Sequence, residues 1–279
     1  MKIMTINEAV MDYAERKSKE VAAKFLRSVR LVYGLSERGN PIGMASCILL
    51  MIDGHHIILT AAHAADITTS GKSPLYIAGE NKLIKIEGEI YTTAAPDGNR
   101  AKDNMDFAFK ILSTSEVSSL GDVDFIEANS VSMNQGSLEG RAFLALGYPC
   151  SKNKEASPRA KEIVSAAWNY QYIIPNSKEK IQDLQIDSAE HFHFPYGKHV
   201  GDYNGNKING VSPKGASGGA LIDLGIFQPG DISPDAVMRG RLAGMFIALK
   251  EGKKMEFVKI QPILHGIRSK LARHHSSTP

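Results

Sequence analysis

Short apolar runs separated by turn residues make up most of the chain from residue 31 onward. In the first half they lie at residues 31–33, 45–52, 56–60, 75–78, 83–91 and 107–112. In the second half they lie at residues 141–147, 168–174, 191–196, 221–222 and 242–249. Turn residues such as Asp53-Gly54 separate them. Many short strands without alternating long helices predict an all-β protein made of two antiparallel β-barrels.

The pattern at residues 5–29 is different and predicts an N-terminal helical extension. Apolar residues recur there at mostly helical spacing, at Ile6, Val10, Tyr13, Val21, Phe25 and Val29. Thr5 and Glu8 have the spacing of a capping box, while Lys17 interrupts the apolar stripe. We expect a helix packed on the outside of the main domain. A helix that binds a partner protein is the alternative.

These patterns divide the chain into four parts. The helical extension covers residues 1–30 and the first barrel residues 31–125. The second barrel covers residues 126–267, and residues 113–135, rich in Ser, Asp and Asn, connect the two barrels. A flexible tail is expected over residues 268–279, because this end is polar and basic.

Composition and charge exclude several classes of function. The formal net charge is +3, so no nucleic-acid partner is expected, and the basic clusters at 152–161 and 268–275 are interpreted as solvated. No apolar run reaches membrane-spanning length, and charges are spread through the first thirty residues where a signal peptide would be apolar. Two cysteines, Cys47 and Cys150, fit a reducing compartment. We therefore expect a cytoplasmic protein with no membrane partner.

Three short motifs carry the chemistry. They are Thr60-Ala61-Ala62-His63, Asp106-Phe107-Ala108 and Gly215-Ala216-Ser217-Gly218-Gly219. A serine hydroxyl is a weak nucleophile that needs a base to take its proton and a third group to orient that base. Histidine, aspartate and a serine among glycines supply this set of groups.

In their order and local motifs, His63, Asp106 and Ser217 resemble the chymotrypsin-like (trypsin-fold) serine peptidases, and the reducing compartment favours an intracellular bacterial type. The similarity covers roughly residues 31–265. It implies a serine endopeptidase in which Ser217 attacks the peptide carbonyl, His63 transfers the proton and Asp106 orients His63. The amides of Gly215 and Ser217 would form the oxyanion hole. The resemblance implies no cofactor and no metal.

Two alternatives compete for these motifs. Asp103 lies three residues before Asp106, but the pattern of aspartate, apolar residue and alanine favours Asp106. The serine motif also fits the nucleophile elbow of the α/β-hydrolases, which needs a strand before the serine, a helix after it, and Asp and His downstream. Here residues 206–214 are polar, and residues 220–224 are strand-like. The elbow is therefore not favoured.

The chain departs from the secreted members of this family at two points. Those enzymes carry aspartate immediately before the nucleophile, where it captures a newly cut N-terminus, whereas this chain has Ala216. Activation by that route is not expected, so the enzyme is either competent as made or gated by a partner or substrate. The disulfide that brackets the catalytic histidine in those enzymes cannot form, because Ala64 follows His63. The sequence does not decide whether Cys47 and Cys150 form a disulfide.

The resemblance also suggests where substrate specificity arises. Val211, six residues before Ser217, would lie at the base of the primary pocket with Ser212 beside it, and Leu249 would fill part of it. We expect a preference for an uncharged residue of small or medium size. His191 and His193 alternate along a predicted strand, and without a third ligand nearby they are interpreted as part of a half-exposed strand.

Two other functions remain open. One is a peptide-binding or scaffold protein that keeps the fold but is proteolytically silent. The other is a protease that a regulatory protein partner switches on, with the N-terminal helix as the contact. The expected partners are a protein or peptide substrate and, for a switched protease, the regulatory protein.

Overall fold

The structure is a computed structural model that describes residues 5–69, 74–79, 82–133, 136–155, 165–201, 206–226, 240–250 and 254–276. The sequence predictions for Ile6 and Val10, for most of the 152–161 cluster and for the last three residues lie outside the described side chains or residues.

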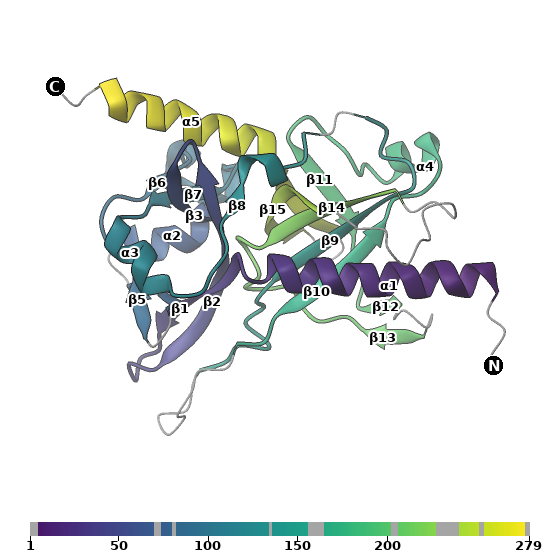
Figure 1. Cartoon of the computed structure of the whole chain (residues 1–279), viewed down its shortest axis with the longest axis horizontal. Helices are drawn as coiled ribbons and strands as arrows, with labels where there is room; N and C mark the ends of the chain where they lie inside the picture. The colour runs from purple at the N-terminus through teal and green to yellow at the C-terminus, as the bar shows by residue number, and fades with distance from the viewer. Residues whose placement is uncertain are drawn as a thin grey trace.

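The first sheet is built from the N-terminal half of the chain (Figure 1). Its strands are β1 (Val29–Leu35), β2 (Pro41–Ile52), β3 (His55–Ala61), β4 (Tyr76–Ala78), β5 (Leu83–Lys85), β6 (Tyr91–Thr92) and β7 (Phe107–Ile111). They pair antiparallel in the order β5-β4-β1-β2-β3-β7-β6, and β8 (Ile126–Glu127) adds a short parallel pairing to β2. Short helices connect them: α2 (Ala62–Thr69), α3 (Thr114–Leu120), and the 3-10 turns η1 (Pro96–Gly98), η2 (Arg100–Lys102) and η3 (Ala128–Ser130).

The second sheet follows in the C-terminal half. Its strands are β9 (Arg141–Gly147), β10 (Trp168–Ile173), β11 (His191–Pro195), β14 (Ala220–Ile226), β15 (Arg241–Lys250) and β16 (Lys254–Lys259). They pair antiparallel in the order β10-β9-β14-β15-β16-β11. A separate hairpin joins β12 (His199–Gly201) to β13 (Lys207–Asn209), and α4 (Lys178–Asp183) precedes β11.

The predicted mostly-β architecture with two antiparallel sheets is confirmed. Closure of each sheet into a full barrel stays a prediction, because the hydrogen-bonded order of the described strands ends at β5 and β6 in one sheet and at β10 and β11 in the other. The single strand expected over 83–91 is wrong. Gly88 takes a φ of +82° between β5 and β6, a left-handed conformation that interrupts an extended strand.

The two sheets share one hydrophobic core. A single cluster of buried side chains includes Ile48 and Leu59 from the first sheet and Leu144, Ile222 and Met245 from the second. These side chains are buried because alternate residues of each strand point to the same face of its sheet. The shared core fixes the two sheets against each other.

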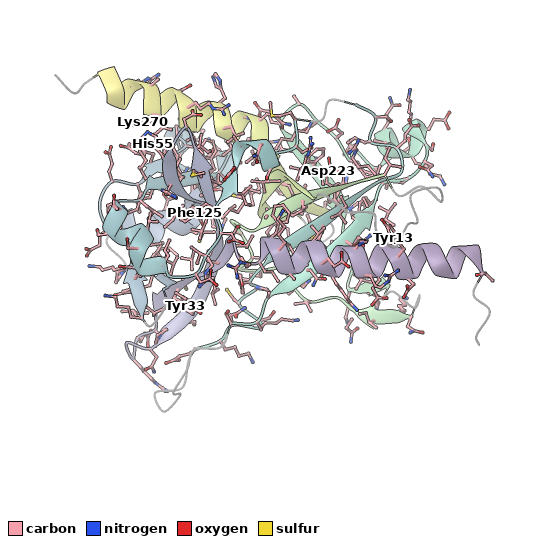
Figure 2. The ribbon with its side chains drawn as sticks, in the orientation of Figure 1. Tyr13, Tyr33, His55, Phe125, Asp223 and Lys270 are labelled. Atoms are coloured by element: carbon pink, nitrogen blue, oxygen red, sulfur yellow. The ribbon has the colours of Figure 1, made fainter. Side chains whose placement is uncertain are left out.

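Helix α1 (Ile6–Phe25) lies along the second sheet (Figure 1). Its described buried face consists of Tyr13, Ala14, Lys17, Ser18, Val21, Ala22 and Phe25, with Tyr13 labelled in Figure 2. Lys17 does not break this face, because its ammonium reaches Glu20 at 3.0 Å. Ser18 donates a hydrogen bond to Gln171 of β10. The expected packing of this helix on the main domain is therefore confirmed over its described side chains.

A second long helix, α5 (Ile260–Ser276), corrects the expectation of a flexible tail from residue 268 (Figure 1). Its buried residues, Ile263, Leu264, Ile267 and Leu271, recur at helical spacing and belong to the shared core. Lys270, labelled in Figure 2, lies 4.5 Å from the centre of the Tyr91 ring. The tail is helical through Ser276 because its apolar stripe continues past residue 268.

Within the described residues, no helix combines the length and apolar character needed to cross a membrane.

Candidate active site

Strand pairing in the first sheet brings His63 and Asp106 together. Ala61, the last residue of β3, pairs with Phe107, the first residue of β7, so the next residue on each side of this pair lies at the same edge. The main-chain N–H of Ala62 donates to the main-chain oxygen of Asp106 at 3.0 Å. His63 Nδ1 then lies 2.6 Å from Asp106 Oδ2, and the His63 N–H donates to Oδ1 at 2.9 Å.

Asp106 is held in an unusual conformation for a residue with a side chain. Its φ is +37°, in the left-handed region, and it is only 8% exposed. Both carboxylate oxygens accept hydrogen bonds from His63, and these contacts offset the cost of burying the charge. A carboxylate at Nδ1 places the ring proton there and leaves the lone pair on Nε2. The His63 side chain is 42% exposed, so Nε2 is accessible as a base.

An arginine that no sequence motif marks ties together the segments carrying these two residues. Arg100 donates two hydrogen bonds to Asp66 of α2, at 2.8 and 2.9 Å, and another to Asp103. Asp66 follows His63 by one helical turn, and Asp103 precedes Asp106 by three residues. The guanidinium therefore links helix α2 to the loop that ends at Asp106.

The structure resolves the competition between the two aspartates. Asp103 is directed away from the histidine, and its side chain, 5% exposed, accepts hydrogen bonds from Thr93, Arg100 and the Met105 N–H. Burial by itself would raise the pKa of Asp103, but hydrogen bonds from Thr93, the Asp106 N–H and Arg100 outweigh it, and the pKa is lowered. Asp103 thus supports the loop, and Asp106 contacts the histidine.

His191 contributes a second support from the other sheet. The alternating pattern predicts a half-exposed strand here, but His191 is buried, and its Nε2 lies 2.7 Å from the main-chain oxygen of Asn104. His193 lies 3.3 Å from Glu256. Among the described residues, no three His, Cys, Asp or Glu side chains gather as a metal site. His191 therefore connects β11 to the loop before Asp106.

The Ser217 loop docks against the same end of the first sheet. The Ser46 N–H donates to the main-chain oxygen of Ser217 at 2.8 Å. Gly218 has a φ of +86°, and a Cβ there would lie 2.0 Å from the Ser46 oxygen, so this close approach requires glycine. The Thr60 hydroxyl donates to that same oxygen at 2.7 Å. Since Thr60 leads directly to His63, the loop is anchored to the strand that positions the histidine.

The Ser217 hydroxyl itself faces a backbone carbonyl. Ser217 is 8% exposed, and its Oγ donates to the main-chain oxygen of Ile247 at 3.0 Å. Within the described part of the chain, no hydrogen bond joins it to His63. The structure thus brings His63 and Asp106 into contact and places Ser217 on an adjoining loop with its hydroxyl turned to β15.

The two N–H groups predicted to form the oxyanion hole are free to donate to a new acceptor. Gly215 has a φ of +86°, and within the described residues neither its N–H nor that of Ser217 donates a hydrogen bond. The neighbouring amides are occupied, since Ala216 donates to Pro213 and Gly218 donates to Phe246. Two unpaired N–H groups next to a serine hydroxyl have the composition of an oxyanion hole.

Of the three residues predicted to form the substrate pocket, two pack against the same hydrophobic cluster and one does not. Val211 and Leu249 are half-buried and pack against the same aromatic-rich cluster, which contains Phe246 and Phe257. The Tyr196 hydroxyl donates to the Val211 main-chain oxygen. Ser212 is exposed. Val211 and Leu249 therefore lie against one hydrophobic cluster, whereas Ser212 faces solvent.

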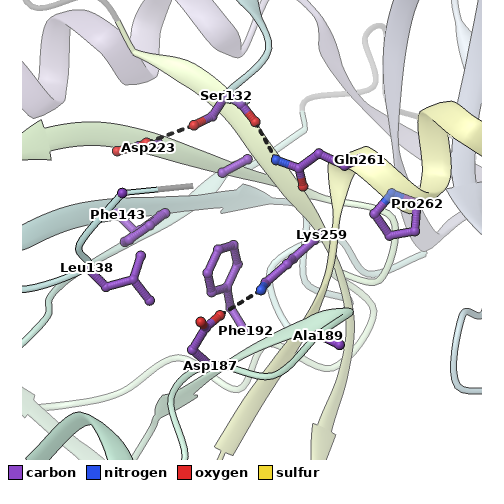
Figure 3. Close-up of a pocket in the computed structure, with 12 residues that line it drawn as sticks. Ser132, Leu138, Phe143, Asp187, Ala189, Phe192, Asp223, Lys259, Gln261 and Pro262 are labelled. Atoms are coloured by element: carbon purple, nitrogen blue, oxygen red, sulfur yellow. Dashed lines mark hydrogen bonds and ion pairs between the residues drawn. The ribbon is translucent and has the colours of Figure 1, made fainter. Parts of the chain in front are cut away.

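A separate hollow of about 340 Å³ lies between the second sheet and the start of α5 (Figure 3). Asp223 accepts hydrogen bonds there from Ser132 at 2.9 Å and from Arg141 at 3.1 Å, and Lys259 pairs with Asp187 at 2.7 Å. None of His63, Asp106 and Ser217 lines it. Its charged groups are paired with one another, which fits a structural role.

Both cysteines are free thiols, so the Cys47–Cys150 bond that the sequence left open is absent. Cys47 is wholly buried in the first sheet, and burial raises its pKa to about 12. Cys150 is half-buried beside the serine loop.

Comparisons with known proteins add a weak structural similarity. Neither a family model nor a curated protein matches the sequence. One similar solved structure comes from work on aromatic interactions that drive the coupled folding and binding of the intrinsically disordered Sesbania mosaic virus VPg protein. It aligns over 82% of this chain and 85% of that chain, with a TM-score of 0.43 and 17% identity. The geometry of His63, Asp106 and Ser217 therefore carries the functional argument.

Proposed function

We propose that this protein is a serine endopeptidase of the chymotrypsin-like type, with the active site between two β-barrels. The observation that carries the proposal is the His63–Asp106 contact of 2.6 Å beside the glycine-rich loop of Ser217. A buried carboxylate on Nδ1, an accessible Nε2, a serine and two free amides are the groups that acyl transfer requires.

The reaction begins with a rotation of the Ser217 side chain from the Ile247 carbonyl toward His63 Nε2. Oγ then attacks the peptide carbonyl carbon while His63 accepts its proton, and the Asp106 carboxylate stabilises the resulting imidazolium. The amides of Gly215 and Ser217 donate to the carbonyl oxygen as it becomes negative. Each such donor contributes about 3 kcal/mol to transition-state stabilisation.

Collapse of this intermediate breaks the C–N bond. His63 returns the proton to the leaving amine, and the acyl group stays on Ser217 as an ester. Water then attacks the ester carbon while His63 accepts its proton. The bond from the acyl carbon to Ser217 Oγ breaks, His63 returns the proton to Oγ, and the second peptide fragment leaves with a carboxylate. Every step uses side chains of this chain, its main-chain amides and water.

Substrate preference follows from Val211 and Leu249. Both are uncharged and pack against a hydrophobic cluster, which supports a pocket for an uncharged residue of small or medium size. Ser212 would lie at its solvent side. Cleavage mainly after Arg or Lys would contradict this assignment. The two free thiols support a reducing compartment such as the cytoplasm.

A second candidate is a proteolytically silent peptide-binding protein, or a protease that a regulatory partner switches on. The bond from Ser217 Oγ to Ile247, with no bond to His63 among the described residues, favours this candidate. The two candidates share the His63–Asp106 pair and the Ser217 loop, and they differ in whether Ser217 reacts without a partner.

Reaction with a fluorophosphonate tests the proposal. The Ser217 Oγ–P bond forms, the P–F bond breaks, and fluoride leaves with the serine proton transferred through His63. Intact mass should show one adduct on wild type, none on Ser217→Ala and greatly slowed labelling on His63→Ala. Ser118→Ala, at an exposed serine of α3, should label like wild type. No adduct on folded wild type, or an adduct retained in Ser217→Ala, would overturn the proposal.

A further inference from the structure

The loop that carries Gly215 and Ser217, called the oxyanion loop below, is held in place without an acidic side chain before Ser217. Ala216, the residue before Ser217, has only a methyl group and is buried. Its N–H donates to Pro213 and its carbonyl accepts from Gly219, so its hydrogen bonds remain inside the loop. Gly215 is the flexible point, because glycine in the left-handed region can leave it at little cost. An external contact must therefore fix the direction of its amide.

Cys150 makes that contact from behind the loop. Its N–H donates to the main-chain oxygen of Lys214 at 2.9 Å. Its thiol packs against the α-carbon of Gly215, since a Cβ at position 215 would lie 2.0 Å from Cys150 Sγ. A side chain at 215 and the thiol at 150 cannot occupy this space together.

The geometry of one peptide group connects this contact to the oxyanion hole. The Lys214 carbonyl and the Gly215 N–H belong to the same planar trans peptide, so they point in opposite directions. A hydrogen bond that holds the Lys214 oxygen toward Cys150 therefore aims the Gly215 N–H away from Cys150. A flip of this peptide would turn that N–H toward Cys150 and remove one donor from the hole.

The other side of Cys150 is anchored to the first sheet. Its Sγ donates to the Gly43 oxygen at 3.2 Å and lies 3.7 Å from the Met44 oxygen, both at the start of β2. Burial raises the pKa of this thiol, so it stays protonated at neutral pH and remains a donor. Cys150 thus lies between β2 and the oxyanion loop.

Asn153 makes the turn around Cys150 rigid. It is 5% exposed, and its amide donates to the Pro149 and Ala166 oxygens at 2.9 and 3.0 Å. Its Oδ1 accepts from the Ala166 N–H at 2.8 Å. Its main-chain N–H donates to Cys150, and its main-chain oxygen accepts from Gly43. The side chain and backbone of one buried residue thus tie the turn together.

We infer that the turn at residues 149–153 orders the oxyanion loop, with Cys150 as the positioning residue that aims the Gly215 amide into the hole. This inference rests on the proposed peptidase function. It explains how the loop can be ordered with Ala216 in place of an acid, without cleavage of the chain.

The test compares an activated ester with its thionoester, using p-nitrophenyl acetate and its thiono analogue. Sulfur is larger and a weaker hydrogen-bond acceptor than oxygen, so loss of an oxyanion donor slows the oxygen ester more. Cys150→Ala keeps the N–H that binds the Lys214 oxygen but removes the thiol that packs on Gly215 and binds the Gly43 oxygen of β2, and Asn153→Ala removes the bonds that tie the turn together. Each change should therefore loosen the turn that holds the Lys214 peptide. If the ordered loop falls to about a tenth of the population, the ester-to-thionoester rate ratio should fall about tenfold. Cys150→Ser keeps a donor of similar size and should stay within about threefold of wild type.

Cys47→Ala is the matched control, because it also removes a buried thiol and should also lower the melting temperature. It should leave the rate ratio unchanged, since the Cys47 side chain packs in the first-sheet core. A wild-type ratio in both Cys150→Ala and Asn153→Ala would overturn the inference and leave the peptidase proposal intact. A folded wild type in which Ser217 reacts with neither ester would overturn both.

Discussion

Ser217 Oγ donates its hydrogen bond to the main-chain oxygen of Ile247, 3.0 Å away. Ile247 lies where the pairing of β15 with β16 shifts register, between Phe246 and Ala248. Its carbonyl is therefore available to a group outside the sheet. In the proposed reaction, the serine must first rotate to another staggered rotamer that faces His63.

A substrate N–H that donates to the Ile247 oxygen should release the serine. A peptidyl phosphonate with a free N–H on its first residue is expected to label Ser217 about threefold to tenfold faster than its N-methyl analogue. This range corresponds to one net hydrogen bond. The measurement is the second-order labelling rate by intact mass. Equal rates for the two probes would show that Ile247 does not receive the substrate.

Arg100 should control both stability and labelling, because it links α2 to the loop before Asp106. Arg100→Ala leaves the buried Asp103 without its cation and should lower the free energy of unfolding by about 3 kcal/mol. Fluorophosphonate labelling should slow as well, whereas Arg100→Lys should recover part of the rate. Lys102→Ala removes only an exposed pair with Asp97 and should cost less than about 1 kcal/mol. Urea unfolding and fluorophosphonate labelling rates, measured on the same variants, test this prediction. An Arg100→Ala variant with the stability and labelling rate of wild type would contradict the proposed link between α2 and the loop before Asp106.

Acid should destabilise the fold through Asp103. Its pKa is lowered in the folded protein, so below its ordinary value the unfolded chain binds more protons than the folded one. The stabilisation is therefore complete above the ordinary pKa and is lost as the pH falls through the folded pKa. The melting temperature of wild type should fall more steeply than that of Asp103→Asn between about pH 5 and pH 3. Parallel curves for the two proteins would contradict this role.

The C-terminal helix should contribute to the core. Leu271→Ala is expected to reduce the free energy of unfolding by about 2–4 kcal/mol, because Leu271 is buried beyond the point where a flexible tail was expected. His265→Ala, on the exposed side of α5, is the control and should change stability by less than about 0.5 kcal/mol. Denaturant unfolding measures both, and equal stability of the two variants would indicate that the end of α5 does not pack.

The sequence predicted those features that depend on local pattern. The strand at 141–147 matches β9, and the motif around Asp106 placed the correct carboxylate against His63. The helical spacing of Ile263, Ile267 and Leu271 indicates the helix, whereas the polar character of the last residues favours a tail. The spacing of the apolar residues therefore predicts this helix better than the overall polarity of the segment does.

The sequence could not predict contacts between distant segments. Arg100 reads as one charge in a polar loop, and His191 as a strand residue, until the fold brings them to Asp66 and Asn104. Cys150 likewise carries no motif of its own, because its position behind Gly215 depends on the packing of both sheets. These supporting residues follow from tertiary structure, whereas the three residues proposed to react lie in local sequence motifs.

Digestion of a mixed peptide library by wild type and Ser217→Ala, with new termini read by mass spectrometry, tests the central claim most directly. Wild type should cut within the peptides, mainly after uncharged residues of small or medium size, and Ser217→Ala should leave them intact. Identical digests from both proteins, or peptides bound but left uncut by folded wild type, would contradict the assignment of Ser217 as a peptidase nucleophile.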